Sequence, residues 1–495
     1  MQALERHIPT AKILLSGITP AQFAQNFVWK NQGSDVLCSF GVHSSLYTQA
    51  RSWLDGDPNR RLIFIEDRPE ALAQLLEESE SILLLKDLRV KLYFLESPLQ
   101  IEPLAKKIGW SAVFLKMELL NLRQSPHFES FYQVIQSTHL AANLLLSDAA
   151  DWGCSAIRHA KKNLSRLFHF AADLSFPNIP ALIVGAGPSL EKNRHLLEPL
   201  RDKALICAGG HALDRLRFPP HFAAAIDKEE PLQRISFPKV PFCFQARTHA
   251  KNFSLIQGES FLVPEGHFSF LNWLTGQEGL FDGGWTVGNF LTALAVQWGC
   301  NPIVFVGMDY CYSGKKKYAQ GSSVAIDGLV ETKNRFGETV WTQRDWLMAV
   351  EWTEKFAEKH PDRQFLNATE GGLEFLTEAR LQDLDWKGIS VQEKVEEAMR
   401  RAPAQKAPSR WAEWEQSLKR CALLCEANVH NLTLDGFEEE VVFNLLLSPL
   451  WQIWKPVFER QLELDLQKMD LAEKVRLNEL LFYQQVVQEH LNALR

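Results

Sequence analysis

The stretch PALIVGAGPSLEKNRHLLEPL, residues 180–200, decides the fold of the middle of the chain. Its apolar residues 181–184 have the character of a buried strand, and a helical pattern begins after the glycine-rich turn. Glycine permits positive φ and bares backbone N–H groups, and a helix N-terminus attracts anions. The turn is therefore either simply tight or open to a phosphate group. The candidate phosphate-binding residues are Gly185, Gly187, Pro188, Ser189 and Leu190.

The turn matches neither of the common phosphate-binding fingerprints. It lacks the six-residue glycine pattern of dinucleotide-binding proteins, and no Gly-Lys-Ser/Thr follows it as in a Walker loop. Its spacing alone leaves a structural turn and a phosphate site as open alternatives. If it is a phosphate site, Ser189→Ala and Gly187→Val should weaken nucleotide binding and leave the fold intact.

Six further apolar runs resemble residues 181–184, and most of them end in a glycine or an acidic residue. They are residues 204–210, 222–227, 242–247, 260–266, 302–310 and 364–372. Strands that alternate with helical segments predict βαβ units and a parallel sheet. In such a doubly wound sheet the ligand lies beyond the carboxyl ends of the strands. We expect a Rossmann-like, nucleotide-binding catalytic domain over residues 178–385.

The flanking regions predict two further domains and a connector. Residues 1–125 contain short apolar runs at 35–41, 60–67, 81–86, 90–97 and 111–117, which we interpret as strands of a smaller α/β domain. Residues 126–177 have helical periodicity and form a helical connector. Residues 386–495 read as a helical C-terminal domain, which can pack on the core or on another subunit, so an oligomer through this region is possible.

Composition excludes several classes of protein. The 495 residues carry a net charge of −7, so a broad basic surface for nucleic acid is not expected. No window reaches the roughly 20 uncharged apolar residues of a spanning helix, and the start lacks a signal peptide. The eight scattered cysteines form no CxxC pair, which indicates reduced, mostly buried thiols and a cytoplasmic protein. No metal site is predicted from their spacing.

Polar residues follow several of the predicted strands. Asp227 ends the run at 222–227 and can bind ribose, hold a metal, act as a base or simply cap a helix. Asp309 is the last residue but one of the run at 302–310. It is followed by Tyr310, Tyr312, Tyr318 and three lysines, 315–317, which suit a leaving phosphate unless the lysines are only solvated. Glu370 lies in a polar turn after the last run. A second glycine-rich turn opens the apolar helix expected from 290, and Gly209 is the last residue but one of the run at 204–210. The candidate ligand-binding residues of these two regions are Gly209, Gly284, Thr286, Gly288 and Asn289.

Several motifs together resemble the family of MptE-like proteins over roughly residues 178–380. They are IVGAGPSLEKN, the strand ending at Asp227, GGWTVGN, GCNPIVFVGMDYCYSGKKKYAQG and LNATEGG, in this order. The family includes motility accessory factors that glycosylate flagellin and an archaeal 6-hydroxymethylpterin diphosphokinase. The three-part layout is similar to that of a motility accessory factor.

The central motifs are also similar to those of bacterial sialyltransferases, which use a CMP-activated nonulosonic acid. The resemblance implies that residues 187–189 hold the nucleotide phosphate and that the tyrosines after Asp309 stabilise the departing CMP phosphate. Those enzymes place a catalytic histidine after the tyrosine loop, but this chain has none from 268 to 359. The base that activates the acceptor is therefore unassigned, with Asp227, Asp309 and Glu370 as candidates by chemical type.

Three functions follow as hypotheses. The first is a glycosyltransferase that moves a sugar from a CMP-type nucleotide donor, with no tightly bound cofactor, to a Ser or Thr hydroxyl of a flagellin-like or other surface protein. The second is a diphosphokinase that needs ATP and Mg²⁺, with Asp227 and Asp309 as possible metal ligands. The third is a nucleotide-binding protein without catalytic activity.

Overall fold

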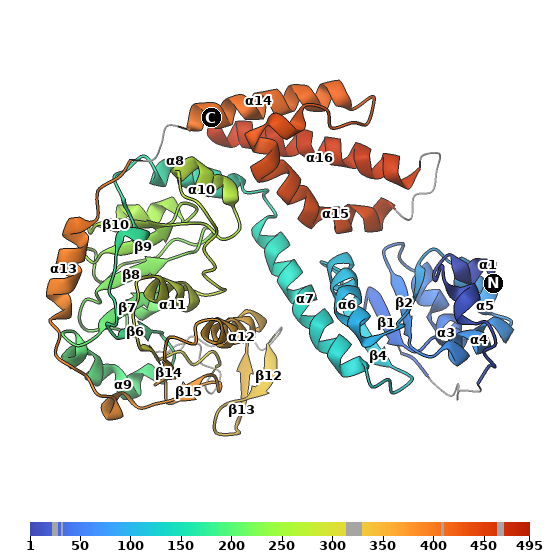
Figure 1. The fold of residues 1–495 in the computed structure, drawn as a ribbon, viewed down its shortest axis with the longest axis horizontal. Coiled ribbons are helices and arrows are strands. Elements are labelled where there is room, and N and C mark those ends of the chain that lie inside the picture. Colours follow the sequence, from blue (N-terminus) through green and yellow to red (C-terminus); the bar gives the residue numbers. More distant parts are fainter. Residues whose placement is uncertain (22–27, 31–32, 313–328, 407–409, 463–469) are drawn as a thin grey trace. The chain divides into compact units, whose positions relative to one another are not determined.

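The computed structural model describes residues 1–21, 28–30, 33–312, 329–406, 410–462 and 470–495. These residues form two compact units (Figure 1). We call the first the N-terminal unit; it comprises Met1–Ala150, Leu423–Phe437 and Leu447–Gln485. The central unit comprises Asp151–Ala422, Glu438–Leu446 and Val486–Arg495. The domain boundaries predicted from the sequence stay predictions.

The N-terminal unit contains a four-stranded parallel sheet of order β3-β2-β1-β4. Its strands are β1 Val36–Phe40, β2 Arg61–Glu66, β3 Val90–Phe94 and β4 Met117–Asn121. Its helices before residue 150 are α1 Gln2–Glu5, α2 Ala11–Leu14, α3 Ser44–Asp55, α4 Pro69–Glu77, α5 Ser81–Lys86, α6 Ile101–Ser111 and α7 Phe128–Asp148. Strands β1 and β2 are buried along their whole length, as parallel strands covered on both faces should be. The predicted small α/β fold is confirmed.

Two predicted strands of this unit are wrong. Residues 81–86 form helix α5 instead, with Leu84 and Leu85 buried and Ile82 and Leu83 exposed. A continuous apolar run of this length does not by itself separate a strand from a one-sided helix, and Leu is a strong helix former. In the run at 111–117, Ser111 ends helix α6, residues 112–116 form the connection, and β4 begins only at Met117.

The central unit contains a nine-stranded sheet of order β15-β14-β11-β6-β7-β8-β9-β10-β5, in which every pairing is parallel. Its strands are β5 His169–Phe170, β6 Ala181–Val184, β7 Leu205–Gly209, β8 Phe222–Ala225, β9 Phe242–Gln245, β10 Ser260–Val263, β11 Ile303–Val306, β14 Phe365–Asn367 and β15 Thr377–Glu378. The prediction of a Rossmann-like parallel sheet is confirmed, including every strand run predicted between 181 and 372. The short edge strands β5 and β15 were not predicted.

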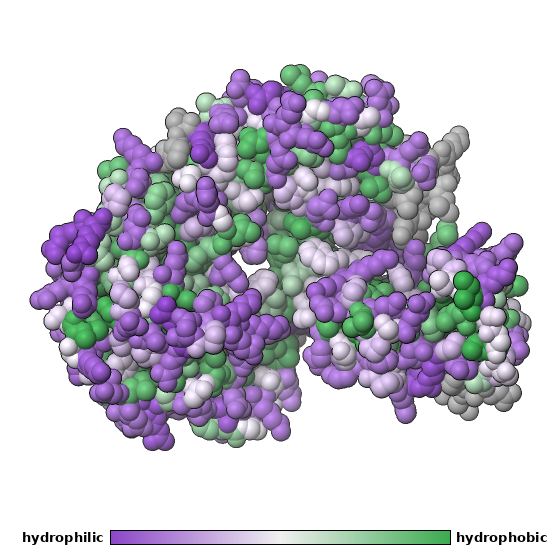
Figure 2. Space-filling view, in the orientation of Figure 1, coloured by the Kyte–Doolittle hydropathy of each residue, from purple (hydrophilic) through white to green (hydrophobic). Residues whose placement is uncertain are grey.

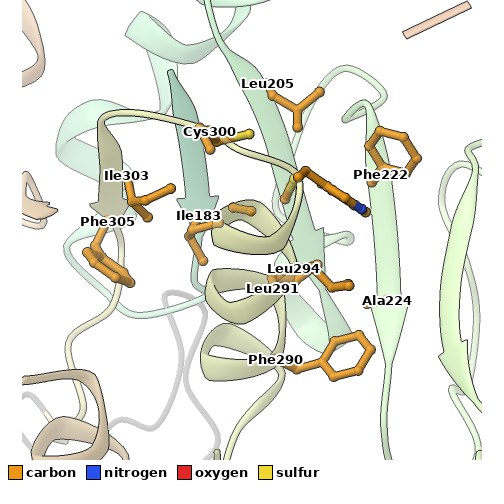
Figure 3. Packing of buried hydrophobic residues seen from close by; sticks show 14 of the residues in the cluster. Ile183, Leu205, Phe222, Ala224, Phe290, Leu291, Leu294, Cys300, Ile303 and Phe305 are labelled. Carbon is orange, nitrogen blue, oxygen red and sulfur yellow. The ribbon is translucent and has the colours of Figure 1, made fainter. Parts of the chain in front are cut away.

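Helix α11, Val287–Gln297, forms the centre of the core of this unit (Figure 3). Its residues 288–295 are all buried, which is typical of a helix that is covered on every side. In Figure 3 the side chains of Phe290, Leu291 and Leu294 point toward residues of neighbouring strands. The labelled strand residues of this cluster are Ile183, Leu205, Phe222, Ala224, Ile303 and Phe305.

The remaining helices and one hairpin complete the two units. The helices are α8 Cys154–Asn163, α9 Leu190–Leu197, α10 Ser269–Thr275, α12 Arg344–Glu358, α13 Val391–Arg401, α14 Trp411–Asn428, α15 Ser448–Leu462 and α16 Leu471–Leu494. Strands β12 Val330–Lys333 and β13 Thr339–Thr342 pair as an antiparallel hairpin. The predicted helical C-terminal region is confirmed, although its helices contribute residues to both units.

The surface and the cysteines agree with the composition. Hydrophilic residues cover most of the visible surface, with apolar residues scattered among them (Figure 2). All eight cysteines are free and buried, as predicted. None of the helices in the described ranges is both long and apolar enough to cross a membrane.

Candidate functional site

The carboxyl edge of the central sheet collects most of the polar residues singled out in the sequence. Strand β6 lies between β11 and β7. After β6 the chain forms β7, β8, β9 and β10 in order on one side, and it then returns to form β11 on the other side of β6. This reversal is the switch point at which doubly wound sheets bind ligands. Along this edge, Asp309 follows β11, the Gly185–Ser189 turn follows β6, and Gly210 follows β7. Asp227 follows β8, and His249 follows β9.

The turn after β6 is closed by Asp309. The hydroxyl of Ser189 donates to Oδ2 of Asp309 at 2.7 Å, and the Ser189 N–H donates to the same oxygen at 3.2 Å. Gly187 is needed because a Cβ there would lie 1.8 Å from that oxygen and 2.8 Å from the carbonyl oxygen of Gly307. A carboxylate therefore takes the place at the N-terminus of α9 that the sequence suggested for a phosphate.

The rest of this turn has structural contacts. The Leu190 side chain is fully buried, and its N–H donates to the carbonyl of Gly187. A Cβ on Gly185 would lie 2.4 Å from the Gly307 carbonyl oxygen, so Gly185 allows β6 and β11 to end close together. The assignment of Ser189 and Pro188 to phosphate binding stays a prediction, since Asp309 holds both Ser189 donors in this structure.

Burial raises the pKa of the Asp309 carboxyl, and the two hydrogen bonds from Ser189 act in the opposite direction. Between the ordinary aspartate pKa and this higher value, the folded protein holds a proton that the unfolded chain has released. Stability from this group is thus present at low pH and falls as the pH rises through that window.

Asp309→Asn is therefore expected to change the pH dependence of stability. Asparagine keeps an oxygen acceptor for Ser189 but cannot ionise, so the variant should gain stability relative to wild type as the pH rises from about 4 toward neutral. Urea unfolding at several pH values measures this difference. A difference that is constant with pH, or that shrinks as the pH rises, would contradict the prediction.

A second group of predicted residues forms the N-terminus of α11. The Thr286 hydroxyl accepts from Asn289 N–H, and the Asn289 side chain accepts from Thr286 N–H, which makes a complete capping box. Within the described residues, the N–H groups of Val287 and Gly288 have no hydrogen-bond partner. Two free donors at the positive end of a helix suit an anion.

Glycines bring this helix end close to the strands. A Cβ on Gly209 would lie 2.3 Å from the Val287 side chain, and one on Gly288 would lie 2.1 Å from the Met308 side chain. Gly284 has a φ of +62° and packs on Asn289 and Trp352. The start of α11 therefore sits at the carboxyl end of β7, beside the residues that follow β11.

Asp227 lies exposed beyond β8, next to a histidine that the sequence did not single out. Asp227 Oδ1 accepts from the N–H of Glu229 at 3.1 Å, and the Asp227 carbonyl accepts from the N–H of His249 at 2.9 Å. His249 Nδ1 accepts from Lys251 N–H at 3.2 Å, so the neutral ring carries its proton on Nε2. Burial and the nearby Lys251 lower the pKa of His249, whereas Asp227 raises it. The backbone hydrogen bond thus holds His249 next to Asp227, and the ring, when neutral, offers an Nε2–H donor.

No local pattern could have identified His249. It lies in the sequence ARTHAKN, without a glycine turn or a family motif, and only the parallel pairing of β8 with β9 brings it to Asp227. The one available signal was its position shortly after a predicted strand.

The remaining predicted residues that the structure describes are Glu370, in the turn after β14, and Tyr312, in the segment after β11. Glu370 has a φ of +57°, and its carbonyl accepts from Lys192 Nζ at 2.6 Å, so the β14 turn joins α9. Tyr312 is buried, with its ring 5.0 Å from that of Trp346. Burial raises the pKa of Tyr310 to about 12, and Thr353 and Thr286 lower it. Tyr318 and lysines 315–317 lie outside the described residues. The catalytic roles of both Tyr312 and Tyr318 stay predictions.

A cavity of about 610 Å³ lies at the opposite edge of the sheet, between residues 219–221, residues 236–241 and helix α13. It adjoins the amino ends of β8 and β9, away from the acidic and glycine-rich strand ends. We place the candidate site at the carboxyl edge, because ligands of doubly wound sheets bind there.

Comparison with known proteins agrees with this fold. The family model described as 6-hydroxymethylpterin diphosphokinase MptE-like matches residues 154–315. This confirms the predicted family resemblance up to residue 315, whereas the last motif, LNATEGG, lies beyond the matched range. No curated protein sequence matches the chain. The solved structure of the MAf glycosyltransferase from Magnetospirillum magneticum AMB-1 has a TM-score of 0.54 and 16% identity, covering 99% of this chain and 82% of that chain. At this identity the likeness establishes the fold alone.

Proposed function

We propose that this chain, whose central unit is MptE-like, is a glycosyltransferase that moves a CMP-activated nonulosonic acid to a serine or threonine hydroxyl of a protein. The observation that carries the proposal is the free N–H pair of Val287 and Gly288 at the carboxyl edge, one strand from Asp227. The fold likeness to a protein named as a glycosyltransferase extends over both units and supports the same class of reaction.

The α11 N-terminus would hold the donor phosphate. Its two free N–H groups and its helix dipole stabilise the negative charge that grows on the phosphate as the sugar–oxygen bond breaks. The electron pair of that bond leaves with the nucleotide monophosphate. The start of α11 lies at the end of β7, so the donor phosphate would lie there too. The sugar is bonded to that phosphate and would therefore lie at the ends of the neighbouring strands.

Asp227 and His249 would act on the sugar side. Adjacent strands are about 4.8 Å apart, so the end of β8 lies about one strand spacing, and that of β9 about two, from the end of β7. Asp227 accepts the proton of the attacking acceptor hydroxyl as the new glycosidic bond forms. His249 Nε2–H donates to the carboxylate that a nonulosonic acid carries on its anomeric carbon. The Asp309–Ser189 pair, on the β11 and β6 side, positions the turn rather than the reacting atoms.

The family description favours a diphosphokinase as the second candidate. That reaction needs Mg²⁺, and Asp227 and Asp309 are its candidate ligands. They follow β8 and β11, which are three strand spacings apart, or roughly 14 Å. Two carboxylates that bind one Mg²⁺ must each reach within about 2.1 Å of it, so this spacing argues against a shared ion.

Nucleotide binding tests the proposal. CMP at 100 times its Kd should stabilise the protein by about 2.7 kcal/mol without added metal, measured as a thermal shift. Val287→Pro should raise the Kd of CMP about 10–100-fold, because it removes one N–H that donates to a charged group. Proline is tolerated at the first helical position, and Thr286 has the extended φ of −133° that precedes proline well.

Val287→Ala is the matched control, since it removes the side chain and keeps the N–H. Equal CMP affinity in the Pro and Ala variants would contradict the phosphate assignment. Stabilisation that requires ATP with Mg²⁺ would favour the kinase, and no stabilisation by any nucleotide would favour a non-catalytic role. Transfer itself is tested by incubation with a CMP-nonulosonic acid and a flagellin-type acceptor, read as an increase in acceptor mass.

A further inference from the structure

The cavity at the amino ends of β8 and β9, which we call the amino-edge cavity, has an apolar wall made largely of proline. Its volume of about 610 Å³ lies within the range of about 300–1,000 Å³ that is typical of small-molecule sites. Proline rings expose carbon atoms, and proline has no backbone N–H, so such a wall offers few hydrogen bonds to water. The wall includes Pro219, Pro220, Phe237, Pro238, Pro241 and Met399.

Backbone hydrogen bonds hold the walls of this cavity in position. The carbonyl of Pro238 accepts from the N–H groups of Gln257 and Gly258, at 2.7 and 2.9 Å. On the other side of the cavity, the chain enters α13 with the Ile389 N–H donating to the Asp202 carbonyl at 3.1 Å. Because the prolines also have a fixed φ, the cavity is formed before a ligand arrives, and little ordering of the wall opposes binding.

The guanidinium group of Arg201 is a charged group of this cavity without a partner. Its Cζ lies 5.9 Å from the centre of the Phe218 ring. Arg201 lines the cavity, and Phe218 directly precedes the wall residue Pro219, so the guanidinium lies beside the apolar wall. Among the described residues, the Arg201 side chain forms no hydrogen bond and no ion pair.

The other ionisable residues of the wall do not balance this charge. His221 Nδ1 accepts from a backbone N–H at 2.9 Å, and burial together with the Arg201 charge lowers the pKa of His221 to about 4, so its ring is neutral at pH 7. Glu396 is exposed and accepts from Gln392 Nε2 at 3.0 Å. Lys239 is a second, exposed cation of the wall. Two cations and one carboxylate leave the cavity with a net positive charge.

We propose that the amino-edge cavity binds a small apolar carboxylate, such as an aromatic acid, with its ring among the prolines and its carboxylate on the Arg201 guanidinium. Burial of the apolar ring stabilises the complex. A guanidinium group donates two parallel N–H bonds to a carboxylate, which fixes the orientation of the ligand. The site lies within the central unit, at the edge opposite the candidate site, and does not depend on the proposed transfer reaction.

Isothermal titration calorimetry of the full chain with 1-naphthoate tests this. We expect saturable binding with one site per chain. Arg201→Gln should raise the Kd of 1-naphthoate about 10–100-fold, because it removes a charge-assisted pair of hydrogen bonds. Arg217→Gln is the matched control, since Arg217 is exposed and does not line the cavity. Arg201 has no hydrogen bond to lose among the described residues, so neither change threatens the fold.

Two further titrations separate the contribution of the charge from that of the apolar wall. The neutral analogue 1-naphthalenemethanol should bind to wild type and to Arg201→Gln with the same affinity, because it has no carboxylate for the guanidinium. Met399→Trp should weaken the binding of both compounds, because the larger side chain fills part of the cavity. A thermal unfolding curve of this variant shows that it is folded.

Equal 1-naphthoate affinity in Arg201→Gln and Arg217→Gln, or no saturable binding to wild type, would overturn the proposal. A concentration-dependent dimer in sedimentation velocity that Met399→Trp abolishes would assign the cavity to a second copy of the chain, which would also overturn it. Val287→Pro should bind 1-naphthoate as wild type does. Failure of the proposed donor site is therefore distinguishable from failure of this one.

Discussion

Gly187→Ala is expected to destabilise the central unit by about 3 kcal/mol or more, because the new Cβ displaces the Asp309 carboxylate from the N-terminus of α9. The ideal Cβ position lies 1.8 Å from Asp309 Oδ2, and the Gly307 carbonyl oxygen at 2.8 Å blocks a shift of the backbone. Displacing Asp309 also leaves the buried Ser189 N–H and hydroxyl without their acceptor. Each unsatisfied buried donor costs about 1–3 kcal/mol.

Chemical unfolding of the full chain measures this loss. Gly388→Ala is the control, because nothing lies within 4 Å of its added Cβ, and its unfolding curve should overlay that of wild type. Gly187→Ala combined with Asp309→Ala should be less destabilised than the sum of the single changes, since the overlap disappears with the carboxylate. If Gly187→Ala is as stable as Gly388→Ala, the close approach of the turn and Asp309 is wrong.

Asp227→Asn is expected to lower the rate of sugar transfer by about 10²–10⁴-fold while CMP binding persists, because the variant cannot accept the acceptor proton. Asparagine keeps an oxygen for the N–H of Glu229, which Asp227 Oδ1 accepts at 3.1 Å, so the local turn should survive. The measurement is release of CMP from a CMP-nonulosonic acid in the presence of the protein acceptor, with the CMP affinity determined separately.

Glu230→Gln provides the matched control, since Glu230 is also an exposed carboxylate of this loop. It should retain the activity of wild type. Full activity of Asp227→Asn would remove Asp227 from the reaction and leave the base unassigned. Loss of both CMP binding and activity would instead indicate that Asp227 holds the nucleotide.

The sequence expectation for Gly187 was wrong in one respect. Gly187→Val was expected to weaken nucleotide binding without disturbing the fold, on the view that the turn faces an open crevice. In the structure Gly187 faces Asp309, which lies 122 residues later in the chain and reaches the turn only because β6 pairs with β11. The glycine was recognised correctly as a site of close approach, but the group that approaches is part of the protein.

Local patterns in the sequence determined the parallel strands of the central unit, the glycine-rich turns after β6 and before α11, and the acidic residues at the strand ends. They did so because strand and helix periodicity and glycine backbone freedom are properties of a few neighbouring residues. Only the tertiary structure decided which strand ends are neighbours. The order of strands in the sheet places Asp309 on Ser189, leaves the α11 donors free and brings His249 to Asp227. These pairings depend on contacts between segments far apart in the chain, and no local pattern encodes them.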